Sequence, residues 1–125
     1  MYLLLDNSDA QQIVLSLWLD NVWVQRVYQS KEFGLIGAID KCFQEEKCVL
    51  KDLGGIAVVV GRGSFTSTRI AVTVANTLSY ALGISVVATS SIEEIGLVDK
   101  IKNAKKDILV SAVYSGEPNI GKKRI

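Results

Sequence analysis

A single stretch sets the architecture of this chain: Ile56-Ala57-Val58-Val59-Val60-Gly61-Arg62-Gly63-Ser64-Phe65-Thr66-Ser67-Thr68-Arg69-Ile70. Its first part is a continuous apolar run rich in β-branched residues, which is typical of a strand buried on both faces. Gly61 and Gly63 permit a sharp turn because neither carries a Cβ that would restrict φ. The hydroxyl side chains that follow can cap a helix, and Gly83 is suited to end it. The stretch therefore predicts a buried strand, a tight turn and a helix over residues 68–82.

The turn over residues 61–67 has two interpretations. A turn at a helix N-terminus presents backbone N–H groups, so it can hold a phosphate or a carboxylate. Alternatively, it is a plain strand-to-helix connection that needs glycines for its geometry alone. The spacing Gly61-x-Gly63-x-x-Thr66 lacks the third glycine of a dinucleotide fingerprint, and no Lys-Ser/Thr pair follows as a P-loop requires. The pattern of residues leaves both interpretations open.

Length and composition indicate one globular domain. The chain has 125 residues, 49% of them apolar, and a mean hydropathy of +0.28, with no signature of disorder. Its apolar runs are too short to cross a membrane, and it has no basic start followed by an apolar segment. A net charge of +1 argues against a strongly nucleic-acid-binding domain. We therefore expect a cytoplasmic protein with no membrane contact.

Several chemistries are excluded by residue types. The sequence contains no histidine, which excludes histidine triads, histidine–metal sites and imidazole acid–base catalysis. Cys42 and Cys48 are six residues apart in a segment predicted to be helical, so they fall on different sides of it. That spacing suits neither a disulfide nor a metal pair. We expect free thiols that serve packing, with no metal and no cofactor.

The remaining elements follow from hydrophobic periodicity. Ser30 is the predicted N-cap of the first helix, and Ser91 with Glu94 matches a capping box for the third. Asp20 and Asn21 suit a two-residue hairpin turn because both tolerate positive φ. Strands are predicted over Tyr2–Leu5, Gln12–Leu19, Val22–Tyr28, Ile56–Val60, Ile84–Thr89 and Asp107–Tyr114, and helices over Lys31–Lys47, 68–82 and Glu93–Lys105.

The order of these elements is β-β-β-α-β-α-β-α plus a C-terminal hairpin. Three leading strands followed by crossover helices predict an α/β fold, in which a mixed five-stranded sheet carries helices on its faces. This is the ribonuclease H-like or actin-like half-fold. No internal repeat or linker interrupts the pattern, so residues 1–125 are expected to form one lobe.

Part of the sequence resembles a known family. From Gly61 to Ile70 it is similar to the TsaB (YeaZ) family, whose pattern there is Gly-Pro-Gly-Ser-Phe-Thr-Gly-x-Arg-Ile-Gly. The likeness continues into Ser90-Ser91-Ile92-Glu93, which is similar to the family's Ser-Ser-Leu-Glu, and residues 3–8 resemble its strand ending in Asp-Thr-Ser. Together these stretches span most of residues 1–95. The resemblance implies the same ribonuclease H-like, actin-like fold.

The resemblance also implies a function. Members of the family act in making the threonylcarbamoyladenosine (t6A) modification of tRNA, as non-catalytic partners of the ATP- and metal-binding protein TsaD, with the ATPase TsaE in the assembly. We therefore expect a scaffold subunit that is not an enzyme and meets tRNA only indirectly. The family has two actin-like lobes, and this sequence corresponds to the first, so the second lobe is expected to be absent. Because nucleotide in actin-like proteins lies between two lobes, we expect no ATPase activity from this chain alone.

The resemblance implies a partner surface on the helix over 68–82, through which a homodimer or a heterodimer is expected. The predicted partner-binding residues are Arg69, Ile70, Thr73, Val74, Thr77, Leu78 and Tyr80. The candidate anion- or nucleotide-binding residues are Asp6, Ser8, Gly61, Gly63, Ser64 and Thr66. Asp6 is interpreted first as a turn residue, since a short polar side chain binds nearby backbone there. The basic cluster Lys122-Lys123-Arg124 either touches tRNA phosphate or is a solvated end.

Two alternatives belong to other classes. One is an actin-like or ribonuclease H-like phosphotransferase or hydrolase that works through Asp6 and the Gly61–Ser67 turn. The other is a divergent paralogue of the family that only associates with itself.

Overall fold

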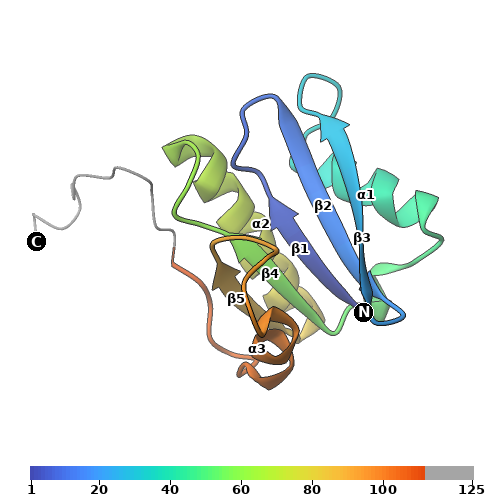
Figure 1. Cartoon of the computed structure of the whole chain (residues 1–125), viewed down its shortest axis with the longest axis vertical. Helices are drawn as coiled ribbons and strands as arrows, with labels where there is room; N and C mark the ends of the chain where they lie inside the picture. The colour runs from blue at the N-terminus through green and yellow to red at the C-terminus, as the bar shows by residue number, and fades with distance from the viewer. Residues whose placement is uncertain (112–125) are drawn as a thin grey trace, which may run out of the picture.

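The computed structural model describes residues 1–111, which form one mixed sheet with helices on both faces (Figure 1). The strand order is β3-β2-β1-β4-β5. The pairs β1–β2 and β2–β3 are antiparallel, and the pairs β1–β4 and β4–β5 are parallel. The elements are β1 (Tyr2–Asp6), β2 (Gln12–Leu19), β3 (Val22–Gln29), α1 (Leu35–Glu45), a short 3₁₀ turn (Leu50–Asp52), β4 (Gly55–Val59), α2 (Phe65–Leu82), β5 (Ser85–Thr89) and α3 (Leu97–Asn103). The predicted five-stranded mixed sheet is confirmed.

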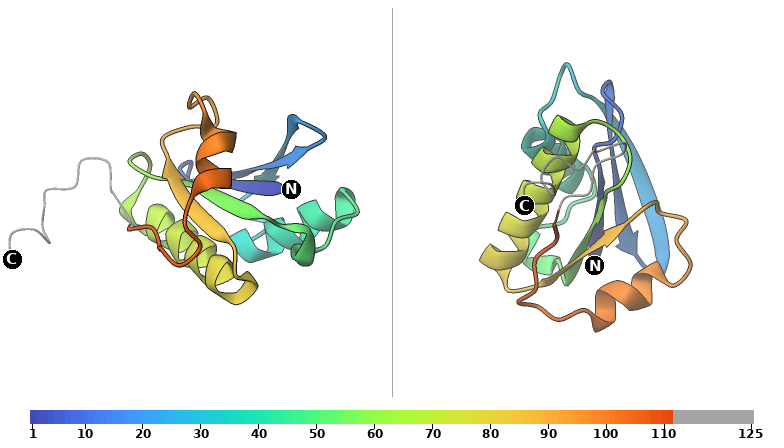
Figure 2. Two further views of the ribbon diagram at one scale, coloured as in Figure 1. Left: turned by 90° about the horizontal axis from the view of Figure 1, so that it is seen from below. Right: turned by 90° about the vertical axis from the view of Figure 1, so that its left-hand side faces the viewer.

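The helices divide the core between the two faces of the sheet (Figure 2). α1 and α2 cover one face, where the larger apolar cluster lies, and α3 covers β4 and β5 on the other. Neighbouring residues of one strand point to opposite faces, so Leu3 and Leu5 join the larger cluster while Leu4 joins the smaller one under α3. β4 is buried along its whole length, as its unbroken apolar run predicts.

The β2–β3 hairpin follows the predicted pattern closely. Asp20 and Asn21 form its two-residue turn with φ of 50° and 64°, the left-handed conformation that such turns require. Ile13, Leu15 and Leu17 are fully buried on the face that meets α1 and α2. Alternation and turn chemistry were therefore enough to set the register of this pair.

The central helix ends at the predicted residue and is capped by one of the predicted hydroxyls, but it begins three residues earlier than predicted. Ser64 is its N-cap, and the Ser64 hydroxyl oxygen accepts a hydrogen bond from the Ser67 N–H at 3.0 Å. Gly83 ends the helix in the left-handed conformation, with φ of 68°. The helix is longer at its N-terminus than residues 68–82, because the cap is the first of the available hydroxyls.

The first helix begins later than predicted. The prediction of a helix over Lys31–Lys47 capped by Ser30 is wrong: α1 starts at Leu35, with Gly34 at the N-cap position and no side-chain cap. The carbonyl of Gln29 instead accepts the N–H groups of Glu32 and Phe33 at 3.0 and 3.1 Å, which forms a turn. The Phe33 ring then packs edge-on against Tyr28. This aromatic contact holds the chain off the helical path until Gly34.

The third helix is shorter than predicted, and its capping box is absent. α3 covers Leu97–Asn103 with Gly96 as N-cap, not Glu93–Lys105. The Glu94 side chain accepts a hydrogen bond from the Thr89 hydroxyl at 2.6 Å instead of closing a box with Ser91. The Glu94 carboxylate, which was predicted to bind backbone at the start of the helix, therefore accepts from the Thr89 hydroxyl at the end of β5 instead. Residues 91–95 lie in turns before the helix.

The predicted strand over Asp107–Tyr114 is wrong in its described part. Residues 107–111 are not in a strand; Val110 is instead bonded to the Asn76 side chain of α2 through both its N–H and its carbonyl, each at 2.9 Å. A side-chain amide thus supplies the partners that a neighbouring strand would have given. The rest of the predicted C-terminal hairpin and the basic cluster Lys122-Lys123-Arg124 lie outside the described residues.

Candidate functional site

The end of β1 and the turn before α2 meet at one edge of the sheet. Gly63 has φ of +80°, and a Cβ added to it would lie 2.4 Å from the carbonyl oxygen of Ser8. The Asn7 side-chain amide donates to the carbonyl of Ser67 at 3.1 Å. The carboxyl ends of the parallel strands β1 and β4 lie at the same edge of the sheet, so two segments about sixty residues apart in sequence meet there. We call these segments, residues 6–8 and 61–67, the loop cluster.

Asp6 closes the first of these loops upon itself. Its Oδ1 accepts hydrogen bonds from the Ser8 N–H at 3.0 Å and from the Ser8 hydroxyl at 2.5 Å. This is the arrangement of an Asx turn, in which aspartate binds the backbone two residues on. Asp6 therefore acts as a turn residue, as its short polar side chain predicts, and Ser8 supplies both hydrogen-bond donors to it.

The second loop presents the first turn of α2 to solvent. Gly61, Gly63, Ser64 and Thr66 are all exposed. The Thr68 hydroxyl donates to the carbonyl of Arg62 at 3.3 Å, which fastens the loop to the helix. All of the candidate anion-binding residues thus lie in the two loops that meet here or at the element ends beside them, and anion binding by them stays a prediction. Within residues 1–111, no group of three or more cysteine, aspartate or glutamate side chains is placed to hold a metal ion.

A third segment completes this edge beyond β5. The Arg62 guanidinium donates to the carbonyl of Ser90 at 3.4 Å. Glu94 accepts hydrogen bonds from the Thr89 hydroxyl and the Lys100 ammonium at 2.6 and 3.1 Å. The Thr89 hydrogen bond, followed by that of Lys100, lowers the pKa of the Glu94 carboxyl below its ordinary value. These hydrogen bonds favour the charged form of the Glu94 carboxyl at the end of β5.

One side of α2 faces away from the sheet, and we call its exposed residues the α2 surface. It consists of Arg69, Ile70, Thr73, Thr77 and Tyr80, at spacings of three and four that place them on one helix face. Ile70 and Tyr80 are 45% and 85% exposed. The opposite side, including Ala71 and Ala75, is fully buried against the sheet.

The other predicted partner-binding residues lie differently. Val74 and Leu78 are partly buried and pack against the larger core cluster, so they sit at the margin of the α2 surface. The Arg69 guanidinium lies 5.0 Å from the centre of the Phe65 ring, a cation–π contact one turn along the helix. Among residues 1–111 no ion pair joins Arg69 to an acidic side chain such as Asp6 or Asp9.

An apolar groove beside α2 was not predicted. It has a volume of about 600 Å³ and lies between α1, the 3₁₀ turn and α2. Ile36, Val49 and Leu50 are 65%, 54% and 40% exposed at it. Ile36 lies one position outside the buried stripe of α1. A large apolar residue at that place was the feature of the sequence that could have indicated the groove. The apolar lining comprises Ile36, Ile39, Phe43, Cys48, Val49, Leu50 and Leu78.

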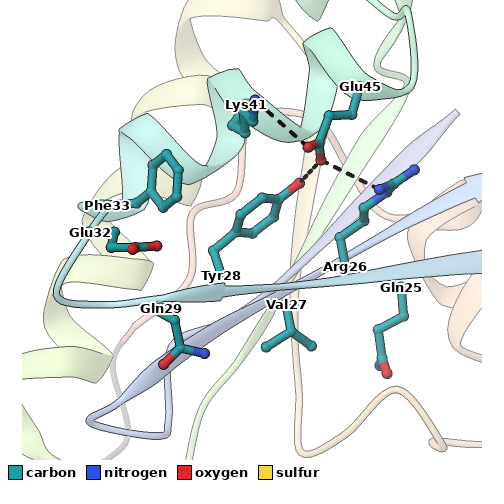
Figure 3. Close-up of a pocket in the computed structure, with 9 residues that line it drawn as sticks. All are labelled: Gln25, Arg26, Val27, Tyr28, Gln29, Glu32, Phe33, Lys41 and Glu45. Atoms are coloured by element: carbon teal, nitrogen blue, oxygen red, sulfur yellow. Dashed lines mark hydrogen bonds and ion pairs between the residues drawn. The ribbon is translucent and has the colours of Figure 1, made fainter.

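A second hollow, of about 460 Å³, lies between β3 and α1 (Figure 3). The Tyr28 hydroxyl donates to Glu45 at 2.7 Å, and Arg26 donates to Glu46 at 2.6 Å. Burial, together with the hydrogen bond to Glu45, raises the pKa of Tyr28 well above its ordinary value. Figure 3 shows Gln25, Val27 and Gln29 pointing away from α1, opposite to Arg26 and Tyr28.

Cys42 and Cys48 are both free. Cys42 is fully buried in α1, while Cys48 lies beyond the end of that helix and is partly exposed. Burial raises the pKa of the Cys42 thiol. Within residues 1–111, no helix has the length and apolarity needed to span a membrane.

The sheet order, the two helices on one face and the loop cluster at the carboxyl ends of the parallel strands define an α/β protein of the actin-like class. Solved structures agree on this fold. YeaZ from Pseudomonas aeruginosa superposes with a TM-score of 0.64 at 24% identity, over 79% of this chain and 49% of that one. A crystal structure described as an uncharacterized protein with similarity to peptidase YeaZ from Pseudomonas aeruginosa gives 0.64 at 23% identity, over 82% and 48%.

The family follows from sequence comparison. The chain belongs to the family described as "TsaD: tRNA N6-adenosine threonylcarbamoyltransferase", whose model matches residues 32–118. It is 36% identical over 72 residues to the tRNA threonylcarbamoyladenosine biosynthesis protein TsaB of Bacillus subtilis (strain 168), covering 51% of this chain and 31% of the relative. It is 34% identical over 89 residues to the TsaB of Buchnera aphidicola subsp. Schizaphis graminum (strain Sg), covering 66% and 42%. The predicted TsaB (YeaZ) membership is confirmed, and the chain spans less than half the length of these curated relatives.

Proposed function

We propose that this chain is a non-catalytic subunit that binds a TsaD-type protein and supports it in making threonylcarbamoyladenosine in tRNA. The names of the curated relatives support the pathway, because both are biosynthesis proteins for this modification. The match to the TsaD family model supports a partner of related fold. A TsaE-type ATPase joins the same assembly, the chain meets tRNA only through its partners, and it acts in the cytoplasm.

The observation that carries the proposal is the α2 surface. Thr73, Thr77 and Tyr80 form an exposed stripe in which the sole charge is that of Arg69, at one end. Exposed helix faces with so few charges mark surfaces that associate with other chains. The groove lined by Ile36 and Leu50 adds apolar area at the margin of that stripe, next to Leu78. A partner helix laid along α2 would cover both.

A supporting role without catalysis fits the chemistry of the loop cluster. The Asp6 carboxylate is occupied by Ser8, and the sequence provides no histidine to act as a base. We assign residues 1–125 to a single actin-like lobe, so a nucleotide at Gly61, Gly63, Ser64 and Thr66 would need its second wall from another chain. In this proposal the loop cluster contributes at most to a site shared with the partner.

The rival function is an actin-like or ribonuclease H-like phosphotransferase or hydrolase. One observation favours it: the structure brings Ser8, which is bonded to the Asp6 carboxylate, against the turn at Gly63. It predicts metal-dependent nucleotide hydrolysis by this chain alone, abolished by Asp6→Ala. Absence of turnover by the isolated chain at saturating nucleotide and Mg²⁺ would exclude this rival.

The proposal is tested by light scattering after size exclusion, on this chain alone and mixed with the TsaD-type protein of the same organism. We expect a one-to-one or two-to-two complex whose affinity falls at least about tenfold with Thr77→Arg. The matched control is Ile95→Arg, because Ile95 is 98% exposed and lies outside α2. A chain that ignores this partner, or a complex unaffected by Thr77→Arg, would overturn the proposal. If the chain associates with itself and with no TsaD-type protein, the alternative of a divergent, self-associating paralogue would remain.

A further inference from the structure

β3 forms an outer edge of the sheet, and part of its backbone is open (Figure 1). The Ser30 N–H donates to the carbonyl of Gln11, so the even-numbered residues of β3 direct their backbone groups toward β2. Trp23, Gln25 and Val27 therefore direct their N–H and C=O groups outward. Within residues 1–111 these groups have no backbone partner.

This edge lacks the features that usually protect one. β3 contains no proline and no lysine, and it pairs with β2 without a bulge from Val22 to Gln29. Its single charged residue, Arg26, is turned toward α1 and bonded to Glu46. The outer carbonyl of Gln29 is covered by the turn that follows, which limits the open edge to the segment before it.

The open segment is complementary to itself in one antiparallel register. Centring the pair on Gln25 places Trp23 opposite Val27 of a second copy and Val22 opposite Tyr28, so aromatic and β-branched side chains meet. All three outward-facing residues then form hydrogen-bonded pairs. Centring on Arg26 would oppose two guanidinium groups, and centring on Val24 would leave Val27 against the turn residue Asn21.

We propose that two copies of this chain associate through β3, in the antiparallel register centred on Gln25, to form one continuous sheet. The arrangement covers Val22 and Val27, which are 55% and 50% exposed in the single chain. In this register Val22 of the second copy would lie opposite Tyr28, which lines the hollow shared with Phe33. This interface is separate from the α2 surface and does not depend on the proposed function.

The first test is self-association measured by light scattering across a range of concentrations. Val27→Lys introduces the charge that protects natural edges and should weaken the dimer at least about tenfold. Val27 is exposed, so the variant should keep the parent's circular dichroism and melting temperature. Ile95→Lys is the matched control and Thr77→Arg the control for α2; both should leave this dimer intact. A monomer at all concentrations, or a dimer lost with Thr77→Arg instead, would overturn the inference.

The second test reads the register directly by disulfide trapping in a Cys48→Ser background. In a hydrogen-bonded pair the two Gln25 Cα atoms would lie about 5.5 Å apart, within disulfide reach, so Gln25→Cys should cross-link on mild oxidation. Val24→Cys should not, because that register separates its two Cα atoms by about 8 Å. Equal cross-linking of both variants, or of neither, would contradict the proposed register. Heterocomplex formation with the TsaD-type protein should persist in Val27→Lys, so the two proposals fail independently.

Discussion

Asn76 and Val110 are joined by a pair of hydrogen bonds that replaces a missing strand neighbour. The Asn76 Nδ2 donates to the Val110 carbonyl, and the Val110 N–H donates to Asn76 Oδ1, both at 2.9 Å. The pair fastens the segment after α3 across α2, on the face of the sheet opposite to α3. Within the described residues, this one side chain therefore holds the segment around Val110 against α2.

Loss of this clamp should be measurable. Asn76→Ala removes two partly buried hydrogen bonds, each worth about 1 kcal/mol net, so the free energy of unfolding should fall by about 1–2 kcal/mol. Urea unfolding measures this change in free energy. In the same variant, amide exchange at Val110 should become faster than in the parent, by more than at other positions of the chain. Thr77→Ala, on the exposed neighbour, should change stability by less than about 0.5 kcal/mol. Unchanged exchange at Val110 would show that the clamp does not hold in solution.

The two turn glycines should respond differently to alanine. Gly61 and Gly63 have φ of +82° and +80°, so alanine costs backbone strain at both. A Cβ at Gly61 meets no atom within 4 Å, whereas at Gly63 it would lie 2.4 Å from the backbone oxygen of Ser8. Gly61→Ala should therefore cost about 1 kcal/mol and Gly63→Ala about 3 kcal/mol or more. Equal losses in chemical unfolding would disprove the close approach of the two loops.

The stability of the chain should depend on Glu94 in acid. Its pKa is lowered in the folded state by Thr89 and Lys100, so its contribution is complete above the ordinary value of 4.5 and is lost as the pH falls through the folded pKa. Glu94→Gln should reduce the loss of stability between neutral pH and about pH 3. Thermal melts over that range measure the effect.

The same carboxyl can be followed directly by NMR titration. Thr89→Val removes the principal hydrogen bond to Glu94, so the pKa of Glu94 should rise toward its ordinary value. Ser90→Ala is the control, since its side chain lies at the exposed neighbouring position and should leave the titration as in the parent. A Glu94 titration that does not move with Thr89→Val would contradict the assigned cause.

The two thiols should differ in reactivity. Burial raises the pKa of both thiols, but Cys42 is fully buried whereas Cys48 is partly exposed and open to a reagent. A thiol reagent should therefore label Cys48 in the native chain and Cys42 only after unfolding. Cys48→Ser should abolish the native signal, and persistent native labelling of that variant would show that α1 opens readily.

Much of the architecture was fixed by local sequence. The β2–β3 hairpin follows from strict alternation and from Asp20 and Asn21, which tolerate positive φ. β4 and α2 follow from an apolar run, two glycines and the Ser64 cap. These features act over a few residues, so pattern and turn chemistry suffice to place them.

The tertiary structure alone set the contacts that adjust the ends of helices and that join separate segments. α1 begins late where Phe33 packs on Tyr28, and α3 begins late where Glu94 binds Thr89, each a contact five residues back to the end of the preceding strand. The approach of Gly63 to Ser8 and the Asn76–Val110 clamp, by contrast, bring together residues far apart in the chain. No local periodicity encodes such contacts, because each depends on where the sheet places the two segments and on the buried hydrogen bonds and packing they gain by meeting.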